Sequence, residues 1–176
     1  MSTKILITGG PGTGKTSLIK ELLNRGFFCF PEIVRELKSS KRSYGVKNYF
    51  ESSPIDFTEK LFDLRTNQYK KEIKSDTIFY DIGPIDSIAY LKFKKINCPS
   101  RLINLAKTIK YDFYFIAEPW EKIYVNDEIR EETFNQCEMI HQSILSTYKQ
   151  FNAELISLPF KSVNDRVEFI LNRINI

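Results

Sequence analysis

The sequence predicts an α/β fold of three layers, in which helices cover both faces of a parallel sheet of about five strands. Short apolar segments that are typical of buried strands alternate with longer segments of helical spacing along the chain. This alternation favours parallel strands connected by helices. The chain has 176 residues, of which 42% are hydrophobic and 27% are charged. These values fit one domain over residues 1–176 and exclude a disordered, collagen-like or coiled-coil protein.

The predicted strands are short and apolar, and the first of them leads into a cluster of glycines. They cover residues 4–8, 27–30, 77–80, 113–116 and 155–158. The first predicted helix, residues 16–25, has apolar residues at helical spacing and ends at Gly26, because glycine readily adopts the conformation that closes a helix. The other predicted helices cover 32–38, 56–74, a segment from about 84, 100–110, 132–151 and 164–174. Segment 39–54 is polar and basic without periodicity, which predicts a mobile loop.

Charge is distributed unevenly along the chain, whose 26 basic and 22 acidic residues give a net charge of +4. Residues 87–111 hold six basic residues and no acidic one. This segment is either a solvated helix face or a surface for nucleic acid, anionic lipid or a phosphorylated substrate. The small net charge does not indicate the wide cationic track that nucleic acid needs, so nucleic acid is not a predicted partner.

The apolar runs and the cysteines bear on where the protein works. No apolar run approaches the ~20 residues of a transmembrane helix, and the apolar run at the N-terminus is too short for a signal peptide. Cys29, Cys98 and Cys137 are far apart and odd in number, so they indicate neither a disulfide framework nor a zinc site. The predicted location is therefore the cytoplasm. The only histidine, His141, lies on an apolar helical stripe and is predicted to belong to the core or its rim.

Residues 9–16 carry the strongest functional signal. They match G-x-x-x-x-G-K-[ST] at every fixed position, and they lie between an apolar strand and an amphipathic helix. Glycines allow backbone N–H groups to approach phosphate oxygens, and the start of the helix adds further N–H groups. Lys15 is expected to bind the β- and γ-phosphates, and the Thr16 hydroxyl to coordinate Mg²⁺. ATP and Mg²⁺ are the predicted cofactors. The predicted nucleotide-binding residues are Gly9, Gly10, Pro11, Gly12, Thr13, Gly14, Lys15, Thr16 and Ser17.

Two acidic residues follow predicted strands and should lie beside the glycine loop. Asp81 comes directly after the strand at 77–80 and is predicted either to hold Mg²⁺ or to accept a proton, although it could instead cap the helix that follows. Glu32 follows the strand at 27–30, and Arg35 lies one helical turn further on. This pair is predicted to border a hydroxylated or anionic acceptor, with a surface ion pair as the alternative.

Two further polar residues complete the predicted site. Gln68 shares a helical stripe with Phe57, Leu61 and Leu64, so its amide is predicted to face inward and to bind substrate, unless backbone groups satisfy it. The charged segment 118–132 follows a strand and is predicted to be a lid. Its Arg130 is expected to neutralise charge during transfer, and a solvated acidic loop is the alternative.

These motifs resemble the AAA-type P-loop family that includes the ribosylnicotinamide kinase domain of NadR and an insect TRPL-translocation-defect protein. The resemblance covers almost the whole chain and depends on the glycine loop, Glu32-x-x-Arg35, Gln68, Asp81-x-Gly83-x-x-Asp86 and Asp127-x-x-Arg130. It implies a P-loop NTPase fold and a nucleotide site. This chain has Gly83 where the NadR-type kinase has a second aspartate, and Ile82 where many bacterial relatives have arginine.

Two functions are compatible with this pattern. The first is a phosphotransferase resembling nucleoside or metabolite kinases, which uses Mg-ATP and a small-molecule phosphate acceptor. Its predicted catalytic residues are Lys15, Asp81, Glu32 and Arg130. The alternative is a nucleotide-gated binding module for a protein or an anionic lipid, with segments 39–54 and 87–111 as its surface. Acceptor-stimulated turnover of the nucleotide distinguishes the two.

Overall fold

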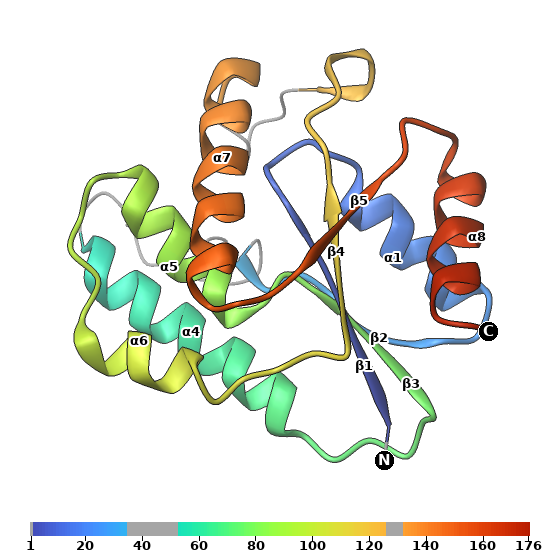
Figure 1. The fold of residues 1–176 in the computed structure, drawn as a ribbon, viewed down its shortest axis with the longest axis horizontal. Coiled ribbons are helices and arrows are strands. Elements are labelled where there is room, and N and C mark those ends of the chain that lie inside the picture. The colour runs from blue at the N-terminus through green and yellow to red at the C-terminus, as the bar shows by residue number, and fades with distance from the viewer. Residues whose placement is uncertain (1, 35–52, 126–131) are drawn as a thin grey trace, which may run out of the picture.

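A computed structural model describes residues 2–34, 53–125 and 132–176. Its centre is a sheet of five strands in the order β2-β3-β1-β4-β5, and each pair of neighbours runs parallel (Figure 1). The strands are β1 (Thr3–Gly9), β2 (Phe28–Phe30), β3 (Thr77–Asp81), β4 (Phe113–Ala117) and β5 (Leu155–Leu158). The predicted three-layer α/β fold with five parallel strands is confirmed.

Helices cover both faces of the sheet (Figure 1). Helices α1 and α8 pack together on one face, and α4, α5, α6 and α7 cover the other. The described helices are α1 (Lys15–Asn24), α4 (Pro54–Lys70), α5 (Pro84–Phe93), α6 (Ser100–Ala106), η1 (Glu121–Ile123), α7 (Phe134–Gln150) and α8 (Val163–Arg173). Among these residues, no helix combines the length and the apolar character needed to cross a membrane.

The predicted helix boundaries differ from the structure at several ends. Helix α4 begins at Pro54 because the fixed φ of proline suits the first turn of a helix, so the predicted loop ends earlier than expected. Helix α7 begins after Thr133, which exchanges hydrogen bonds with Gln136 in a capping box. Most of the predicted helix at 32–38 and most of the loop at 39–54 lie outside the described residues.

Two apolar clusters lie on opposite faces of the sheet, because successive side chains of a strand point to opposite sides. Leu6 of β1 belongs to the cluster beneath α4, α5, α6 and α7, together with Tyr80 and Tyr148. Ile5 and Ile7 belong to the cluster beneath α1 and α8. All of these side chains are at most 1% exposed, and burial of each large apolar side chain contributes about 1.5–3 kcal/mol.

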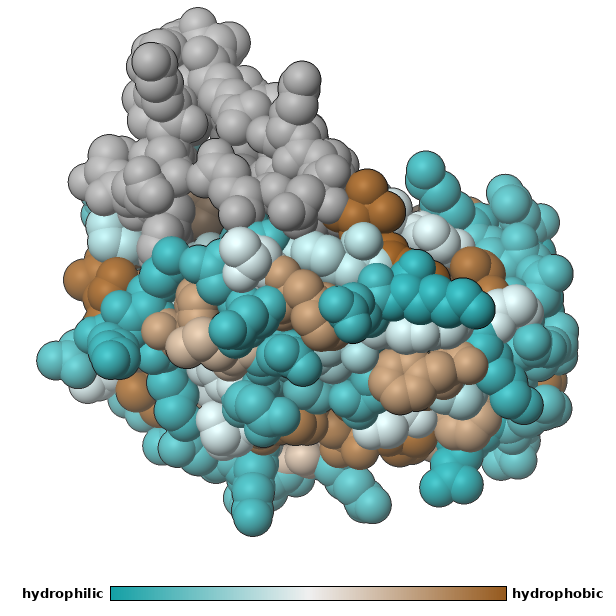
Figure 2. Space-filling view, turned by 90° about the horizontal axis from the view of Figure 1, so that it is seen from above, coloured by the Kyte–Doolittle hydropathy of each residue, from teal (hydrophilic) through white to brown (hydrophobic). Residues whose placement is uncertain are grey.

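The carboxyl ends of the strands meet at one edge of the sheet, which is the upper edge in Figure 1. Asp81 at the end of β3 lies opposite Ile7 of β1, and Ala117 at the end of β4 lies opposite Gly9. Figure 2 looks down on this edge. Hydrophilic side chains cover most of the visible part, with apolar ones scattered between them. Ligands of open parallel sheets bind at this edge, so the functional groups are expected to lie here.

Candidate functional site

The glycine loop joins the end of β1 to the start of α1. Gly9, Gly12 and Gly14 have φ angles of +137°, +77° and +85°. A Cβ atom at Gly9 would lie 2.5 Å from the carbonyl oxygen of Ala117, and one at Gly12 would lie 2.5 Å from the ring of Tyr124. Both positions therefore require glycine. Gly14 precedes the first residue of α1 and provides no side-chain cap, so the first N–H groups of the helix suit an anionic ligand.

Lys15 is folded into the centre of this loop. Its ammonium group donates hydrogen bonds to the carbonyl oxygens of Gly9 at 2.9 Å and Gly10 at 2.7 Å, and the residue is 8% exposed. Burial lowers the pKa of Lys15, and the negative charges of Asp81 and Glu32 oppose this change. A phosphate would offer this ammonium group charged acceptors in place of neutral carbonyls.

Asp81 lies beside the glycine loop, as predicted from its place at the end of a strand. The residue is 3% exposed, and its Oδ1 accepts no hydrogen bond from the described residues. The pKa of Asp81 is raised to about 7, mainly by burial and next by the charge of Glu32, while Lys15 and Arg65 oppose this change. Asp81 does not cap α5, because the backbone N–H of Gly83 donates to Asp86 at 2.9 Å instead. A buried carboxylate oxygen without a partner suits a cation.

Glu32 is paired with a buried arginine that the sequence analysis missed. Arg65 of α4 is 4% exposed, and its Nη2 lies 2.9 Å from Oε1 of Glu32. The same arginine donates to the hydroxyl of Ser87 at 2.9 Å. Arg35, which was the predicted partner of Glu32, lies outside the described residues, so that pairing stays a prediction.

One cavity of about 890 Å³ joins these groups. The glycine loop with Lys15, Thr16 and Ser17 borders it at one end. Glu32, Arg65 and Asp81 also line this cavity, so the juxtaposition predicted for Glu32, Asp81 and the glycine loop is confirmed. Its apolar lining comes mainly from α4, α5 and α7. These side chains are Phe57, Leu61, Tyr90, Ile140 and Ile144.

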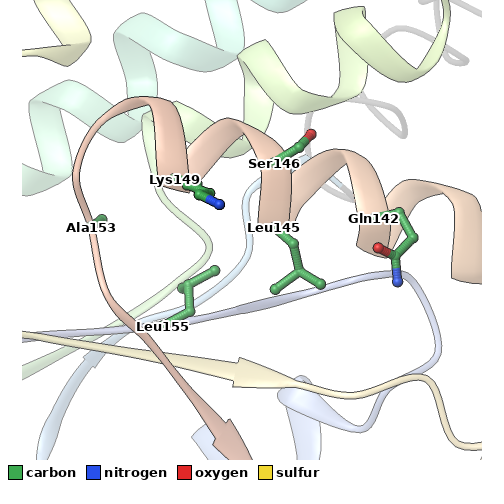
Figure 3. A pocket seen from close by; sticks show the side chains of 6 residues that line it. All are labelled: Gln142, Leu145, Ser146, Lys149, Ala153 and Leu155. Atoms are coloured by element: carbon green, nitrogen blue, oxygen red, sulfur yellow. The ribbon is translucent and has the colours of Figure 1, made fainter.

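A smaller hollow of about 430 Å³ lies between α7 and β5 (Figure 3). Leu145, Ala153 and Leu155 form its apolar part, while Gln142 and Lys149 stand at its sides. None of the predicted site residues that the structure describes lines this hollow. The groups expected to bind the nucleotide border the larger cavity instead.

The prediction for Gln68 is wrong in its geometry. Leu64, which was placed on the same inward stripe, is 38% exposed, and the buried face of α4 is formed instead by Phe57, Leu61 and Arg65 with their neighbours. Gln68 is half-buried, donates to the carbonyl oxygen of Pro31 at 3.5 Å and is not among the residues that line the cavity. Its alternative interpretation, an amide satisfied by backbone, agrees with this contact.

The first part of the predicted lid covers the glycine loop. Ile123 lines the cavity beside Gly14, and the ring of Tyr124 lies over Gly12. The hydroxyl of Tyr124 donates to the carbonyl oxygen of Glu132, so this ring also joins the two described ends of the segment. Arg130 lies outside the described residues, and its role stays a prediction.

Two further contacts support the loop from the helices. Arg166 of α8, 3% exposed, donates from both Nη atoms to the carbonyl oxygen of Thr13 at 3.3 and 3.2 Å. Cys137 of α7 donates from Sγ to the carbonyl oxygen of Pro11 at 2.9 Å. Neither contact was predicted, because the residues that meet across the fold lie 153 and 126 positions apart.

A buried carboxylate also connects β1, α5 and α7. Asp86 accepts hydrogen bonds from the hydroxyls of Thr8 and Tyr148, the latter at 2.5 Å.

His141 is 3% exposed, and its Nε2 lies 2.9 Å from Oε2 of Glu118. Burial lowers the pKa of His141. The prediction of a core histidine is confirmed.

The comparisons with known proteins agree with this arrangement. A family model described as an AAA domain matches residues 4–166. No sequence among the curated proteins matches the chain. The similarity to the insect TRPL-translocation-defect protein stays a prediction.

Several solved structures have the same fold. Deoxyadenosine kinase from M. mycoides with bound dATP has a TM-score of 0.74 at 17% identity, with 99% of this chain and 100% of that chain covered. A NadR protein in complex with NR has a TM-score of 0.75 at 14% identity, with 99% of this chain and 50% of that chain covered. Thymidylate kinase from Ehrlichia chaffeensis has a TM-score of 0.66 at 16% identity, with 98% of both chains covered. At these identities the likeness shows the fold.

Proposed function

The chain belongs to this family of AAA domains and has the P-loop kinase fold, and from that premise we propose that it is a small-molecule kinase. It would transfer the γ-phosphoryl group of ATP to a hydroxyl group of a small acceptor, with Mg²⁺ as cofactor. One observation carries the proposal. A glycine loop with its lysine, and two carboxylates on neighbouring strand ends, border a single cavity.

The triphosphate would bind at the glycine loop. Lys15 would exchange its bonds to the carbonyl oxygens of Gly9 and Gly10 for bonds to phosphate oxygens. Thr16 and Ser17, in the first turn of α1, would contribute their hydroxyls and backbone N–H groups.

The residues present fit a magnesium ion. The unpartnered Oδ1 of Asp81 and the hydroxyl of Thr16 border the same cavity, and both are oxygen donors of the kind that Mg²⁺ prefers. Asp81 and Thr16 would hold the ion directly or through water. When bound, it would offset the negative charge of the phosphates.

Glu32 would accept the proton of the acceptor. The acceptor oxygen would form a bond to the γ-phosphorus while the bond from that phosphorus to the β,γ-bridging oxygen breaks, which releases ADP. The proton of the hydroxyl would pass to the Glu32 carboxylate, which lines the cavity and is 20% exposed. The apolar walls formed by α4, α5 and α7 favour an acceptor that carries a ring.

The proposal is tested by measuring ADP release with Mg-ATP and a panel of nucleosides, nucleotides and ribosylnicotinamide. We expect one class of acceptor to raise ADP release well above the rate without acceptor. Lys15→Ala should abolish triphosphate binding without unfolding the protein, because the side-chain hydrogen bonds of Lys15 with the described residues all go to the glycine loop. Lys20→Ala is the matched control, since this lysine borders the cavity from an exposed position on α1.

Two results would contradict the kinase. If Lys15→Ala binds ATP with normal affinity, the glycine loop is not the nucleotide site. Tight ATP binding without stimulation by any acceptor would support the alternative, a nucleotide-gated binding module. We further propose that the protein works in the cytoplasm, because Cys29, Cys98 and Cys137 form no disulfide within the described part of the chain.

A further inference from the structure

Arg65 is a buried arginine. Burial of an arginine lowers the free energy of unfolding unless its charge is paired and its N–H groups have acceptors. Its guanidinium lies inside the α4 face that meets the cavity, and its side chain is 5% exposed. An apolar residue at this position would extend the Phe57–Leu61 stripe without that cost. Packing alone therefore does not account for an arginine at this position.

The contacts of Arg65 connect two segments that carry the carboxylates. Nη2 lies 2.9 Å from Oε1 of Glu32, which follows β2. Nη1 donates to the hydroxyl of Ser87 at 2.9 Å and approaches the carbonyl oxygen of Gly83 at 3.5 Å. Gly83 lies two residues after Asp81. One side chain thus fixes the position of Glu32 relative to the segment that follows Asp81.

The same contacts leave one oxygen of Glu32 unused. The backbone N–H of Val34 also donates to Oε1, at 3.2 Å. Both hydrogen bonds that Glu32 accepts from the described part of the chain therefore end on Oε1. Its Oε2 accepts none from those residues, and Glu32 borders the cavity.

Arg65 itself is not arranged to bind a phosphate. Both Nη atoms already donate to protein groups, and Nε is buried without an acceptor among the described residues. Arginines that clamp phosphate present two free N–H groups side by side. By this geometry Arg65 differs from a cationic side chain that binds the phosphate of a substrate.

We propose that Arg65 is a positioning residue for phosphoryl transfer, which holds Glu32 by Oε1 so that Oε2 receives the proton of the acceptor hydroxyl. The inference rests on the proposed kinase function. Loss of the guanidinium would let the Glu32 carboxylate rotate, and a displacement of about 1 Å at a reacting group costs roughly 100-fold in rate. ATP binding should be unaffected, because the hydrogen bonds of Arg65 with the described residues include none to the glycine loop.

The test compares kcat and KM of Arg65→Ala, Glu32→Gln and the double variant, with the acceptor identified by the panel. Arg65→Ala should lower kcat by about 100-fold and leave the KM for ATP within about threefold of the wild-type value. Because both residues act through one carboxylate, Arg65→Ala should lower kcat less than about threefold further in the Glu32→Gln background. Arg65→Lys should recover part of kcat, since one ammonium group can reach only some of the three partners.

The matched control is Arg101→Ala. Arg101 also forms an ion pair with a glutamate of α4, Glu59 at 3.2 Å, but it is 53% exposed and does not line the cavity. Its removal should leave kcat unchanged. Circular dichroism and ATP titration establish that each variant is folded, and Arg65→Lys replaces Arg65→Ala if the alanine variant is not.

Three outcomes would overturn the inference. The first is a kcat of Arg65→Ala, or of Arg65→Lys in its place, within threefold of the wild-type kcat. The second is a kcat of the double variant that is lowered by the product of the two single losses. The third is a loss of kcat in Arg101→Ala equal to that in the Arg65 variant. A wild-type protein without acceptor-stimulated turnover would refute the proposed function, and the role of Arg65 with it. That result is separate from the other three, because they require an active wild-type enzyme.

Discussion

Replacing Asp81 by asparagine should make the ligand-free protein more stable at alkaline pH, although it removes a residue of the proposed metal site. Asp81 is 3% exposed and has an oxygen without a partner among the described residues. Burial therefore penalises its ionised form, which is the form present at high pH. Asparagine has nearly the same shape and no charge, so Asp81→Asn removes the penalty without leaving a cavity.

The size of the effect follows from the pKa of Asp81, which burial raises from 3.8 to about 7. Between about pH 4 and about pH 7 the folded state keeps a proton that the unfolded state has lost. The contribution of Asp81 to the free energy of unfolding is thus fully present below about pH 4. It falls as pH rises through the interval and stays low above about pH 7. At about 1.36 kcal/mol for each pH unit, the loss between about pH 5 and about pH 8.5 is about 3 kcal/mol.

Urea unfolding of the wild type and of Asp81→Asn at these two pH values measures this difference. The advantage of the variant should be about 3 kcal/mol larger at the higher pH. Asp63→Asn, at an exposed position of α4, is the control and should show no such change. An advantage that is the same at both pH values would refute the burial argument. Mg-ATP should stabilise the wild type more than Asp81→Asn, which tests the metal role separately.

Two further substitutions test the loop and the buried network. Gly12→Ala places a methyl group against the Tyr124 ring, so ATP affinity should fall by more than about tenfold in calorimetric titration. Because φ at this position is +77°, backbone strain should also lower the free energy of unfolding by about 1–2 kcal/mol. Gly26→Ala, at φ +88° with open space around it, should show the strain alone, and an equal loss of ATP affinity there would contradict the steric argument. Tyr148→Phe removes a hydrogen bond to the carboxylate of Asp86 and should lower the free energy of unfolding by about 1.5–3 kcal/mol, with ATP affinity unchanged. A loss below about 0.5 kcal/mol in urea unfolding would mean that water satisfies Asp86.

The elements of the fold could be predicted because each has a local signal. The strands are short apolar runs, and Asp81 was located because a strand end fixes the edge of the sheet at which a residue lies. Helix boundaries were less accurate, since they depend on caps such as the pair formed by Thr133 and Gln136.

The inward face of α4 could not be predicted by periodicity alone. Two stripes begin at Phe57 and Leu61, one continuing to Leu64 and the other to Arg65. Hydrophobicity favours Leu64, yet it is the exposed one, at 38%. Arg65 can be buried because Glu32 pairs with its charge and Ser87 and the Gly83 carbonyl accept hydrogen bonds from Nη1. These partners come from segments that only the fold brings together. The contact of Tyr124 with Gly12 was missed for the same reason.

The separation of the two apolar clusters by the sheet has a consequence for how such a protein can diversify. The cluster beneath α1 and α8 includes Leu18 and Leu22 of the helix that follows the glycine loop. Ile140 and Ile144, which line the other end of the cavity, belong to the cluster beneath α4, α5, α6 and α7. Changes on opposite faces share few contacts, so their effects on stability should add independently. Mutations that reshape the acceptor walls can therefore accumulate over evolutionary time while α1 and α8 continue to support the nucleotide loop, provided that Cys137 keeps its contact with Pro11. A designer can vary one face of the sheet with the other held constant.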